Sequence, residues 1–149
     1  MPSQPLSLKG RALKLLAARE HSRAELQRKL QPLEESPGQI ARLLDELQAR
    51  GFLDEQRVVD ALLHRRAPRL GSARVRQELL ARGLPAAAVQ QATADLRSTE
   101  LARARAVWDK KFGQPAADAA GRARQMRFLI ARGFAAEAVR RVVHAADDD

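Results

Sequence analysis

LLARGLPAAAV, residues 79–89, returns fifty residues later as LIARGFAAEAV, residues 129–139, with seven of the eleven positions identical. Counting back another fifty residues from Ser72 and Leu80 reaches Ser22 and Leu30, in a segment with the same apolar pattern. A unit of about fifty residues buries too little surface to be very stable alone, so copies stack on their neighbours. The sequence therefore predicts three copies of one small unit, with an extended surface or groove for a partner.

The composition indicates that these units are helical. Apolar residues make up 45% of the 149 residues but aromatic residues only 3%, so leucine and alanine must fill the interior. Both favour helix, and no segment alternates apolar and polar residues over the length of a strand. We expect an all-α fold of three tandem three-helix repeats forming an elongated, curved module. Their expected bounds are residues 1–52, 53–97 and 98–149, the last with an acidic C-terminal tail.

Capping residues predict where the helices of the first unit begin and end. Ser22 with Glu25 three positions later forms a capping box. Ser36 before Pro37 starts the next helix, and Gly51 ends it. The helices of this unit are expected at residues 7–20, 22–31 and 37–50.

The later units show the same sequence of signals. Asp54 caps a helix that stops before Pro68, Gly71-Ser72 opens one that runs to Gly83, and Pro85 starts a third. In the last unit, Ser98 or Thr99 caps the first helix, Gly113 and Pro115 break it, and Gly133 separates the remaining two. Trp108 and Phe112 lie one helical turn apart, a spacing that suits base stacking, but the neighbouring apolar residues favour a place in the core.

The net charge of +9 is unevenly distributed. Residues 1–60 hold 10 basic and 9 acidic side chains, whereas residues 61–146 hold 17 basic and 6 acidic ones. Such a field favours a polyanionic or acidic partner. Codon bias is an alternative source of the 22 arginines, but it does not explain why the two halves differ.

The residues needed for most catalytic chemistry are missing. There is no cysteine and no glycine-rich phosphate loop, and the three histidines, His21, His64 and His144, stand far apart. We therefore expect no metal, no cofactor and no enzymatic activity, and we interpret His21 as a local packing residue. No window approaches the length of a membrane span, so a soluble cytoplasmic protein is expected.

Ten basic residues form two clusters, each made where one helix ends and the next begins. The candidate partner-binding residues are Arg65, Arg66, Arg69, Arg74 and Arg76 in the second unit, and Lys110, Lys111, Arg122, Arg124 and Arg127 in the third. Arginine offers a planar fork of donors that suits carboxylates and phosphates. A cation near a helix C-terminus also stabilises the helix dipole, but two equivalent clusters favour binding. Each cluster is expected to converge on one corner of its unit.

Residues 19–30, REHSRAELQRKL, resemble the RecX family of bacterial recombinase regulators. The similarity continues at residues 51–54, GFLD, at Gly71-Ser72 with Arg74, and at residues 128–134, FLIARGF. It covers nearly the whole chain. The resemblance implies an all-helical protein that binds the RecA recombinase, chiefly its filament on single-stranded DNA. There it would block filament growth and reduce strand exchange, ATP hydrolysis and coprotease cleavage, without a catalytic signature of its own.

A second hypothesis is a stand-alone DNA-binding module that uses the helices around Gly83 as a helix-turn-helix. The helix after Gly83, residues 85–91, has little besides Gln90 and Gln91 that could read bases. Weak nonspecific DNA binding is compatible with both hypotheses. The preferred partners are therefore RecA and the RecA-DNA filament.

Overall fold

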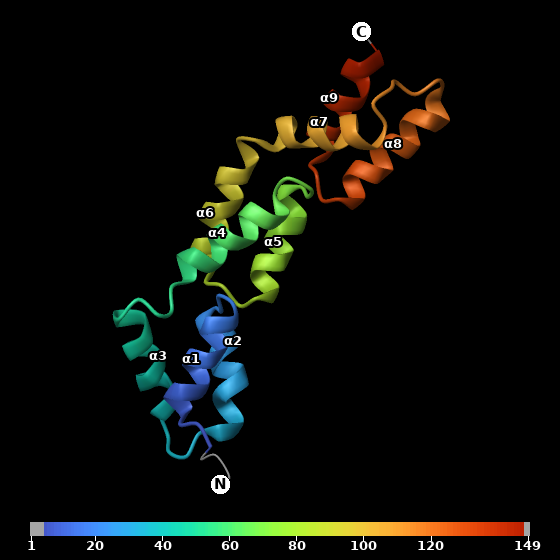
Figure 1. Cartoon of the computed structure of the whole chain (residues 1–149). Coiled ribbons are helices and arrows are strands. Elements are labelled where there is room, and N and C mark those ends of the chain that lie inside the picture. The colour runs from blue at the N-terminus through green and yellow to red at the C-terminus, as the bar shows by residue number, and fades with distance from the viewer. Residues whose placement is uncertain (1–4, 148–149) are drawn as a thin grey trace.

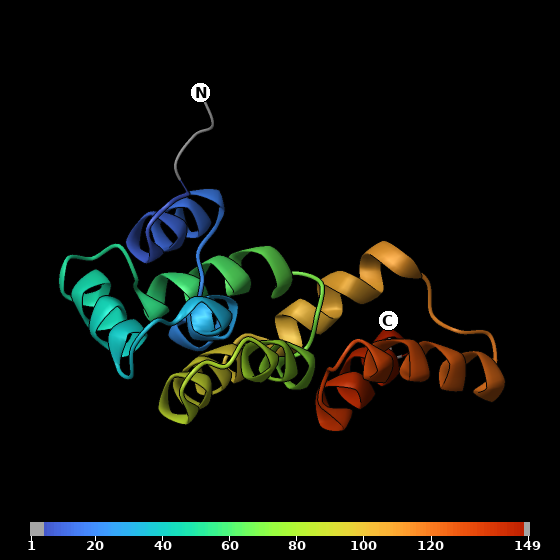
Figure 2. The same ribbon diagram turned by 90° about the horizontal axis from the view of Figure 1, so that it is seen from below.

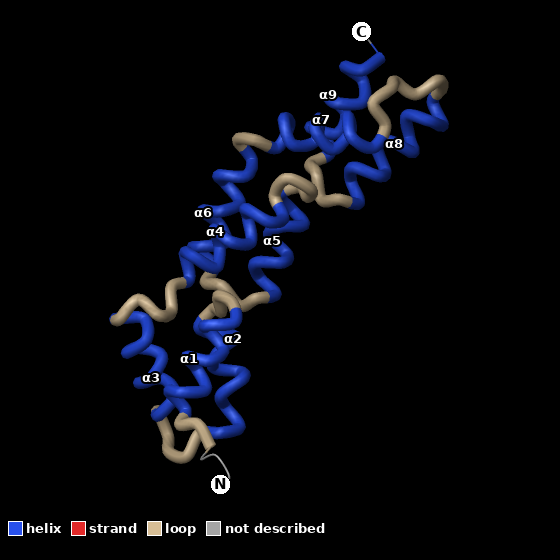
Figure 3. The backbone as a smooth tube through the Cα atoms, viewed as in Figure 1, coloured by secondary structure: helices blue, strands red, loops and turns tan. Residues whose placement is uncertain are grey.

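The computed structural model of the protein describes residues 5–147, and in this range the regular structure is entirely helical (Figure 3). Asp148 and Asp149 of the acidic tail lie outside the described residues. The helices are α1 (Leu8–Ala18), α2 (Arg23–Leu30), η1 (Gln31–Leu33), α3 (Gln39–Ala49), α4 (Glu55–Arg66), α5 (Ser72–Ala81), α6 (Ala86–Arg97), α7 (Glu100–Lys111), α8 (Ala119–Ala131) and α9 (Ala136–Asp147).

Three helical units follow one another along an elongated molecule (Figures 1 and 2). The first unit contains α1 to α3, the second α4 to α6, and the third α7 to α9, and each has its own apolar cluster. The clusters are built on Leu26, Leu30, Leu44 and Leu47; on Val58, Val75, Leu79 and Val89; and on Trp108, Leu129, Val139 and Val142. The expected all-α fold of three-helix repeats is confirmed.

The predicted helix signals at Ser22 and Asp54 are confirmed. The Ser22 hydroxyl accepts from the Glu25 amide at 3.1 Å, and the Ser22 amide donates to the Glu25 carboxylate at 3.0 Å, which completes the capping box. The Asp54 carboxylate accepts from the amides of Gln56 and Arg57 at the start of α4. Each cap satisfies amides that have no partner within the helix.

The predicted start of α3 at Pro37 is wrong. The helix begins at Gln39 after Gly38, whose φ of +80° is a left-handed conformation. The Glu34 carboxylate accepts from the Ile40 amide at 3.1 Å, so it caps the first turn in place of Ser36. The chain reaches this point through the short helix η1, which extends the end of α2.

The fifty-residue register holds between the second and third units but not between the first and second. Leu79 and Leu129 are both fully buried, as the repeat predicts. Leu30, however, is buried like Leu79, whereas Leu80 is 43% exposed. The structural spacing between the first two units is therefore forty-nine residues, because α2 begins at Arg23, one position later than a fifty-residue register counted back from Ser72 implies.

Trp108 lies in the core of the third unit, as the neighbouring apolar residues predicted. Its indole Nε1 donates to the Gln125 carbonyl oxygen at 2.9 Å, and Gln125 Nε2 in turn donates to the Gln114 backbone carbonyl. Both Trp108 and Gln125 are buried, so α7 and α8 are joined by a polar contact inside an apolar cluster. The neighbouring rings of Phe112 and Phe128 pack edge to face, 5.4 Å apart.

Candidate functional site

Four of the nine basic side chains of the first unit form ion pairs with carboxylates. Lys9 Nζ lies 2.6 Å from the Glu46 carboxylate, and Arg23 lies 2.8 Å from Asp45. Further ion pairs join Arg19 to Glu25 and Arg50 to Glu46, and Glu20 pairs with Arg57 of α4 in the second unit. The first unit thus pairs part of its positive charge internally, in keeping with its nearly neutral sequence.

The second unit is attached to the first through the turn between α5 and α6. The Arg82 guanidinium donates to the Glu25 carboxylate at 3.1 Å and to the Glu20 backbone carbonyl at 2.9 Å. The Ser22 hydroxyl donates to the Arg82 carbonyl. Burial raises the pKa of the Glu25 carboxyl, but the Ser22 amide and the Arg19 and Arg82 guanidinium groups outweigh it and lower this pKa to about 2.

The third unit is attached to the second through the equivalent turn, between α8 and α9. The Gly71 amide donates to the Arg132 carbonyl at 2.8 Å, and the Ala73 amide donates to the Gly133 carbonyl at 3.2 Å. A Cβ on Gly71 would lie 2.2 Å from the Gly133 backbone, so glycine is required for this approach. The repeated Ala-Arg-Gly segments are therefore the joints between units as well as helix ends.

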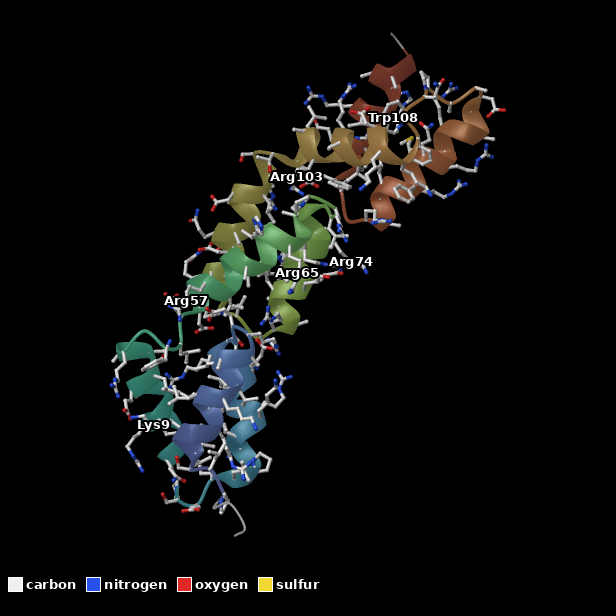
Figure 4. The ribbon with its side chains drawn as sticks, in the orientation of Figure 1. Lys9, Arg57, Arg65, Arg74, Arg103 and Trp108 are labelled. Atoms are coloured by element: carbon white, nitrogen blue, oxygen red, sulfur yellow. The ribbon has the colours of Figure 1, made fainter. Side chains whose placement is uncertain are left out.

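A buried ion pair completes this second joint. Glu100, which is 5% exposed, accepts from the Ser72 amide at 3.1 Å and from the Ala135 amide at 3.0 Å. Arg103 lies 3.2 Å from the Glu100 carboxylate and also donates to the carbonyls of Ala67, Leu70 and Leu96. Figure 4 places Arg103 where the second and third units meet. Burial lowers the pKa of the Arg103 guanidinium, while Glu100 opposes that change.

Two of the five predicted arginines of the second unit have structural partners. Arg66 forms a two-bond ion pair with Glu78, at 2.9 and 3.1 Å, which joins α4 to α5. Arg74 donates to the Ala131 carbonyl at 3.3 Å, and its backbone packs against Gly133. These two side chains contribute to the fold, which sequence spacing alone did not indicate.

The other three arginines of that cluster are exposed but lie in different grooves. Arg65 lines a groove at the first joint together with Arg19, Arg82 and the carboxylates of Glu20 and Glu25. Arg76 lines a different groove, of about 560 Å³, between α5 and α6. Arg69 lies at the second joint. The expected single corner of five guanidinium groups is therefore wrong, because the side chains leave α4 and α5 in different directions.

The predicted residues of the third unit are also divided. Lys110 and Lys111 end α7 and line the same groove as Arg69, and Arg124 lies near the α7–α8 loop beside Asp118. Arg127 is exposed on α8, and Arg122 is partly buried and engaged within the structure. One corner does not hold these five side chains either.

Cations from both predicted clusters meet in a groove between the second and third units. We call it the inter-unit groove, and its volume is about 680 Å³. It is lined by Pro68, Arg69, Ala106, Val107, Lys110, Lys111, Phe128 and Arg132. Sequence reasoning missed Arg132, because its Ala-Arg-Gly context was interpreted as the end of a helix. Its place at the joint follows from the fold.

His21 has a structural role, as predicted. It is buried, its Nδ1 pairs with the Arg19 carbonyl at 2.9 Å, and its Nε2 pairs with Lys29 Nζ at 3.0 Å. Burial lowers the pKa of the imidazole, which fits a neutral ring. Within residues 5–147, no three histidine, cysteine or carboxylate side chains are arranged to hold a metal ion. No helix in this range has the length and apolar character to cross a bilayer.

Comparison with known proteins identifies the family. The third three-helix domain of RecX matches residues 98–143, and the first matches residues 9–47. Regulatory protein RecX of Leptothrix cholodnii is 59% identical over 144 residues, covering 97% of this chain and 92% of that protein. The relative from Ralstonia nicotianae is 49% identical over 147 residues, covering 99% of this chain and 92% of its own length.

The fold is likewise that of a solved relative. The crystal structure of RecX from Lactobacillus salivarius superposes with a TM-score of 0.76 at 13% identity, covering 95% of this chain and 96% of that one. Because the identity is low, this similarity supports the arrangement of helices alone. With the sequence matches, which span almost the full length, it leads to one conclusion: this chain belongs to the RecX family of regulatory proteins.

Proposed function

We propose that this protein is an inhibitor of the RecA recombinase that binds the RecA filament on single-stranded DNA. Binding limits filament growth and thereby reduces strand exchange, ATP hydrolysis and coprotease activity. The observation that carries this proposal is membership of the RecX family, with 59% identity to a regulatory protein RecX over 97% of the chain. The protein acts by binding, without catalysis of its own, in the cytoplasm and in the recombination, repair and SOS processes that RecA serves.

The proposed contact surface consists of those predicted partner-binding residues whose side chains are exposed and form neither an ion pair nor a hydrogen bond among the described residues. They are Arg65, Arg69, Arg76, Lys110, Lys111, Arg124 and Arg127. Cations that are not neutralised within the protein attract acidic surfaces and phosphates. We divide the chain at residues 52/53 and 97/98, so this surface belongs to the second and third units. The elongated shape in Figure 1 lets it extend along a filament.

The stand-alone helix-turn-helix alternative has less support. The turn at Gly83 is packed against the first unit, where a Cβ on Gly83 would lie 2.6 Å from the Ala24 Cβ. Arg82 beside it is occupied by Glu25 and the Glu20 carbonyl. A helix-turn-helix needs its turn and recognition helix free to approach the major groove. Here the first unit covers that turn.

The test is RecA-dependent ATP hydrolysis on single-stranded DNA with increasing amounts of the protein. We expect substoichiometric protein to slow hydrolysis, because one molecule that stops filament growth affects many RecA subunits. Unchanged hydrolysis at saturating protein would reject the proposal. Tight, sequence-selective duplex binding without RecA would instead favour the helix-turn-helix alternative.

A further inference from the structure

The inter-unit groove concentrates positive charge without neutralising it. Arg69 comes from the loop after α4, Lys110 and Lys111 from the end of α7, and Arg132 from the end of α8. No carboxylate lines the groove, and within the described part of the chain none of these four cations forms an ion pair. Like charges gathered in one groove repel one another, so an anionic ligand would stabilise the arrangement.

An aromatic ring holds two of these cations in place. Lys111 Nζ lies 5.3 Å and the Arg132 guanidinium carbon 4.9 Å from the centre of the Phe128 ring. Phe128 is itself fixed by its edge-to-face contact with Phe112. A cation over the face of an aromatic ring is attracted by the negative potential of that face. These contacts reduce the freedom of two long side chains before a ligand arrives.

We propose that the inter-unit groove binds the phosphodiester backbone of nucleic acid. In this assignment Arg69, Lys110, Lys111 and Arg132 contact phosphates, and Phe128 positions the last two. This assignment rests on the proposed function, because a RecA filament carries a DNA strand and the protein would meet that strand there.

The geometry favours phosphates over the carboxylates of an acidic protein. The four cations come from three segments and line one continuous groove, and a nucleic-acid strand presents one negative charge per nucleotide in series. Arginine forks and lysine point charges are both ordinary phosphate ligands. The field of the basic second and third units would also speed the approach of a polyanion.

The test uses the full chain without RecA and fluorescein-labelled DNA, and it measures anisotropy over a series of salt concentrations. One arm uses oligo(dT) and the other a hairpin duplex, which distinguishes the two sources of phosphodiester. In Lys110→Gln/Lys111→Gln we expect at least tenfold weaker binding at low salt. The slope of log affinity against log salt should flatten by about 1.4 for oligo(dT), since each lost phosphate contact removes about 0.7.

Arg140→Gln/Arg141→Gln is the matched control. It removes the same charge from two exposed, adjacent arginines of α9 that do not line the inter-unit groove, and we expect its salt slope to stay within error of the wild-type value. An equal flattening in both variants would mean that net charge alone drives binding, and would overturn the assignment. Absence of binding to either DNA at low salt would also overturn it and would leave an acidic protein as the occupant.

A third variant tests the positioning role of Phe128. In Phe128→Leu all four cations remain, so we expect the salt slope to be unchanged while affinity falls several-fold. Phe128→Tyr keeps the ring and should restore wild-type affinity. If Phe128→Leu binds as tightly as the wild type, Phe128 does not position the cations.

The same proteins in the RecA hydrolysis assay separate this inference from the proposed function. Wild-type protein that slows hydrolysis but binds no DNA would reject the phosphodiester site and keep the proposed function. Protein that binds DNA through Lys110 and Lys111 but leaves hydrolysis unchanged would keep the phosphodiester site and reject the proposed function.

Discussion

Gly83 is required at the first joint by both its backbone conformation and its surroundings. Its φ is +74°, and a Cβ would lie 2.6 Å from the Ala24 Cβ of the neighbouring unit. Gly51 has nearly the same φ, +78°, but a Cβ there would meet nothing within 4 Å. Comparing the two glycines therefore distinguishes the cost of a left-handed backbone, which both positions share, from the cost of the close contact between units, which only Gly83 has.

For this pair we predict unequal losses of stability on substitution by alanine. Gly51→Ala should cost about 1 kcal/mol of unfolding free energy, from the left-handed backbone alone. Gly83→Ala should cost about 3 kcal/mol, because the contact with Ala24 adds overpacking. Urea unfolding followed by circular dichroism measures both, and equal losses would show that Gly83 does not pack closely against the first unit.

Glu25 makes the first joint sensitive to acid. Its pKa is about 2 in the folded protein, against an ordinary value of 4.5. Because the folded value is depressed, the stabilisation is fully present above pH 4.5 and is lost as the pH falls toward 2. We predict that Glu25→Gln has a flatter dependence of stability on pH between 5 and 2 than the wild type. Thermal unfolding over this range checks it; parallel curves would contradict the prediction.

At single residues, sequence identified the basic candidates but not their partners. Arg65 and Arg66 are adjacent in the chain, yet Arg66 is paired with Glu78 and Arg65 is exposed in a groove. The difference depends on the direction in which each side chain leaves α4, and on a carboxylate twelve residues away. Local patterns do not contain that information.

At the scale of elements, capping chemistry located some helix starts but not others: Thr99 stands at the N-cap of α7, as predicted, yet its side chain makes no capping hydrogen bond. The capping box of Ser22 and Glu25 and the Asp54 cap depend on neighbouring residues, and both were predicted. The start of α3 was misplaced because the first turn is capped by Glu34, six residues before the amide that it accepts from. Caps that reach back across a loop lack a fixed spacing in sequence.

The packing of α7 on α8 depends on the buried pair of Trp108 and Gln125. We predict that Trp108→Phe destabilises the protein by about 2–3 kcal/mol, because it reduces core volume and leaves the Gln125 oxygen without a donor. The double variant Trp108→Phe/Gln125→Leu should recover part of this loss, since the unpaired polar group is removed. Chemical unfolding of the two variants decides the matter; a double variant less stable than the single one would contradict the polar explanation.

For the whole molecule, the repeat predicted the number of units but not how they are joined. The segments at residues 81–83 and 131–133 look like helix ends in sequence, and they become joints because the preceding unit presents the start of its second helix to them. Glu100 and Arg103 were not predicted as partners of distant backbone groups, since those contacts exist only after the units stack. Long-range docking is thus the part of the fold that local patterns omit.

The second joint should make the third unit unfold together with the rest. Trp108 is the single tryptophan, so its fluorescence reports on the third unit, whereas circular dichroism reports on all helices. We predict coincident urea transitions in the wild type and separated ones in Arg103→Met, where Glu100 loses its buried ion-pair partner at a cost of about 3–5 kcal/mol. Arg105→Met, on the exposed side of α7, should keep the transitions coincident. Coincident transitions in Arg103→Met would contradict a coupling role.

The most direct test of the proposed RecA regulation compares charge reversals in two parts of the chain. One variant carries Arg65→Glu, Arg76→Glu, Arg124→Glu and Arg127→Glu, in the second and third units. The control carries Arg11→Glu, Lys14→Glu, Arg28→Glu and Arg42→Glu, which are exposed cations of the first unit without ion pairs among the described residues. Both change the net charge by the same amount.

The measurement is the rate of RecA ATP hydrolysis on single-stranded DNA as a function of added protein. We predict that the control inhibits hydrolysis at a concentration within a factor of about two of the wild-type value. The second- and third-unit variant should need at least about tenfold more protein for the same inhibition, which corresponds to about 1.4 kcal/mol of binding free energy. Equal inhibition by the two variants, or no inhibition by the wild-type protein, would contradict the proposed regulation.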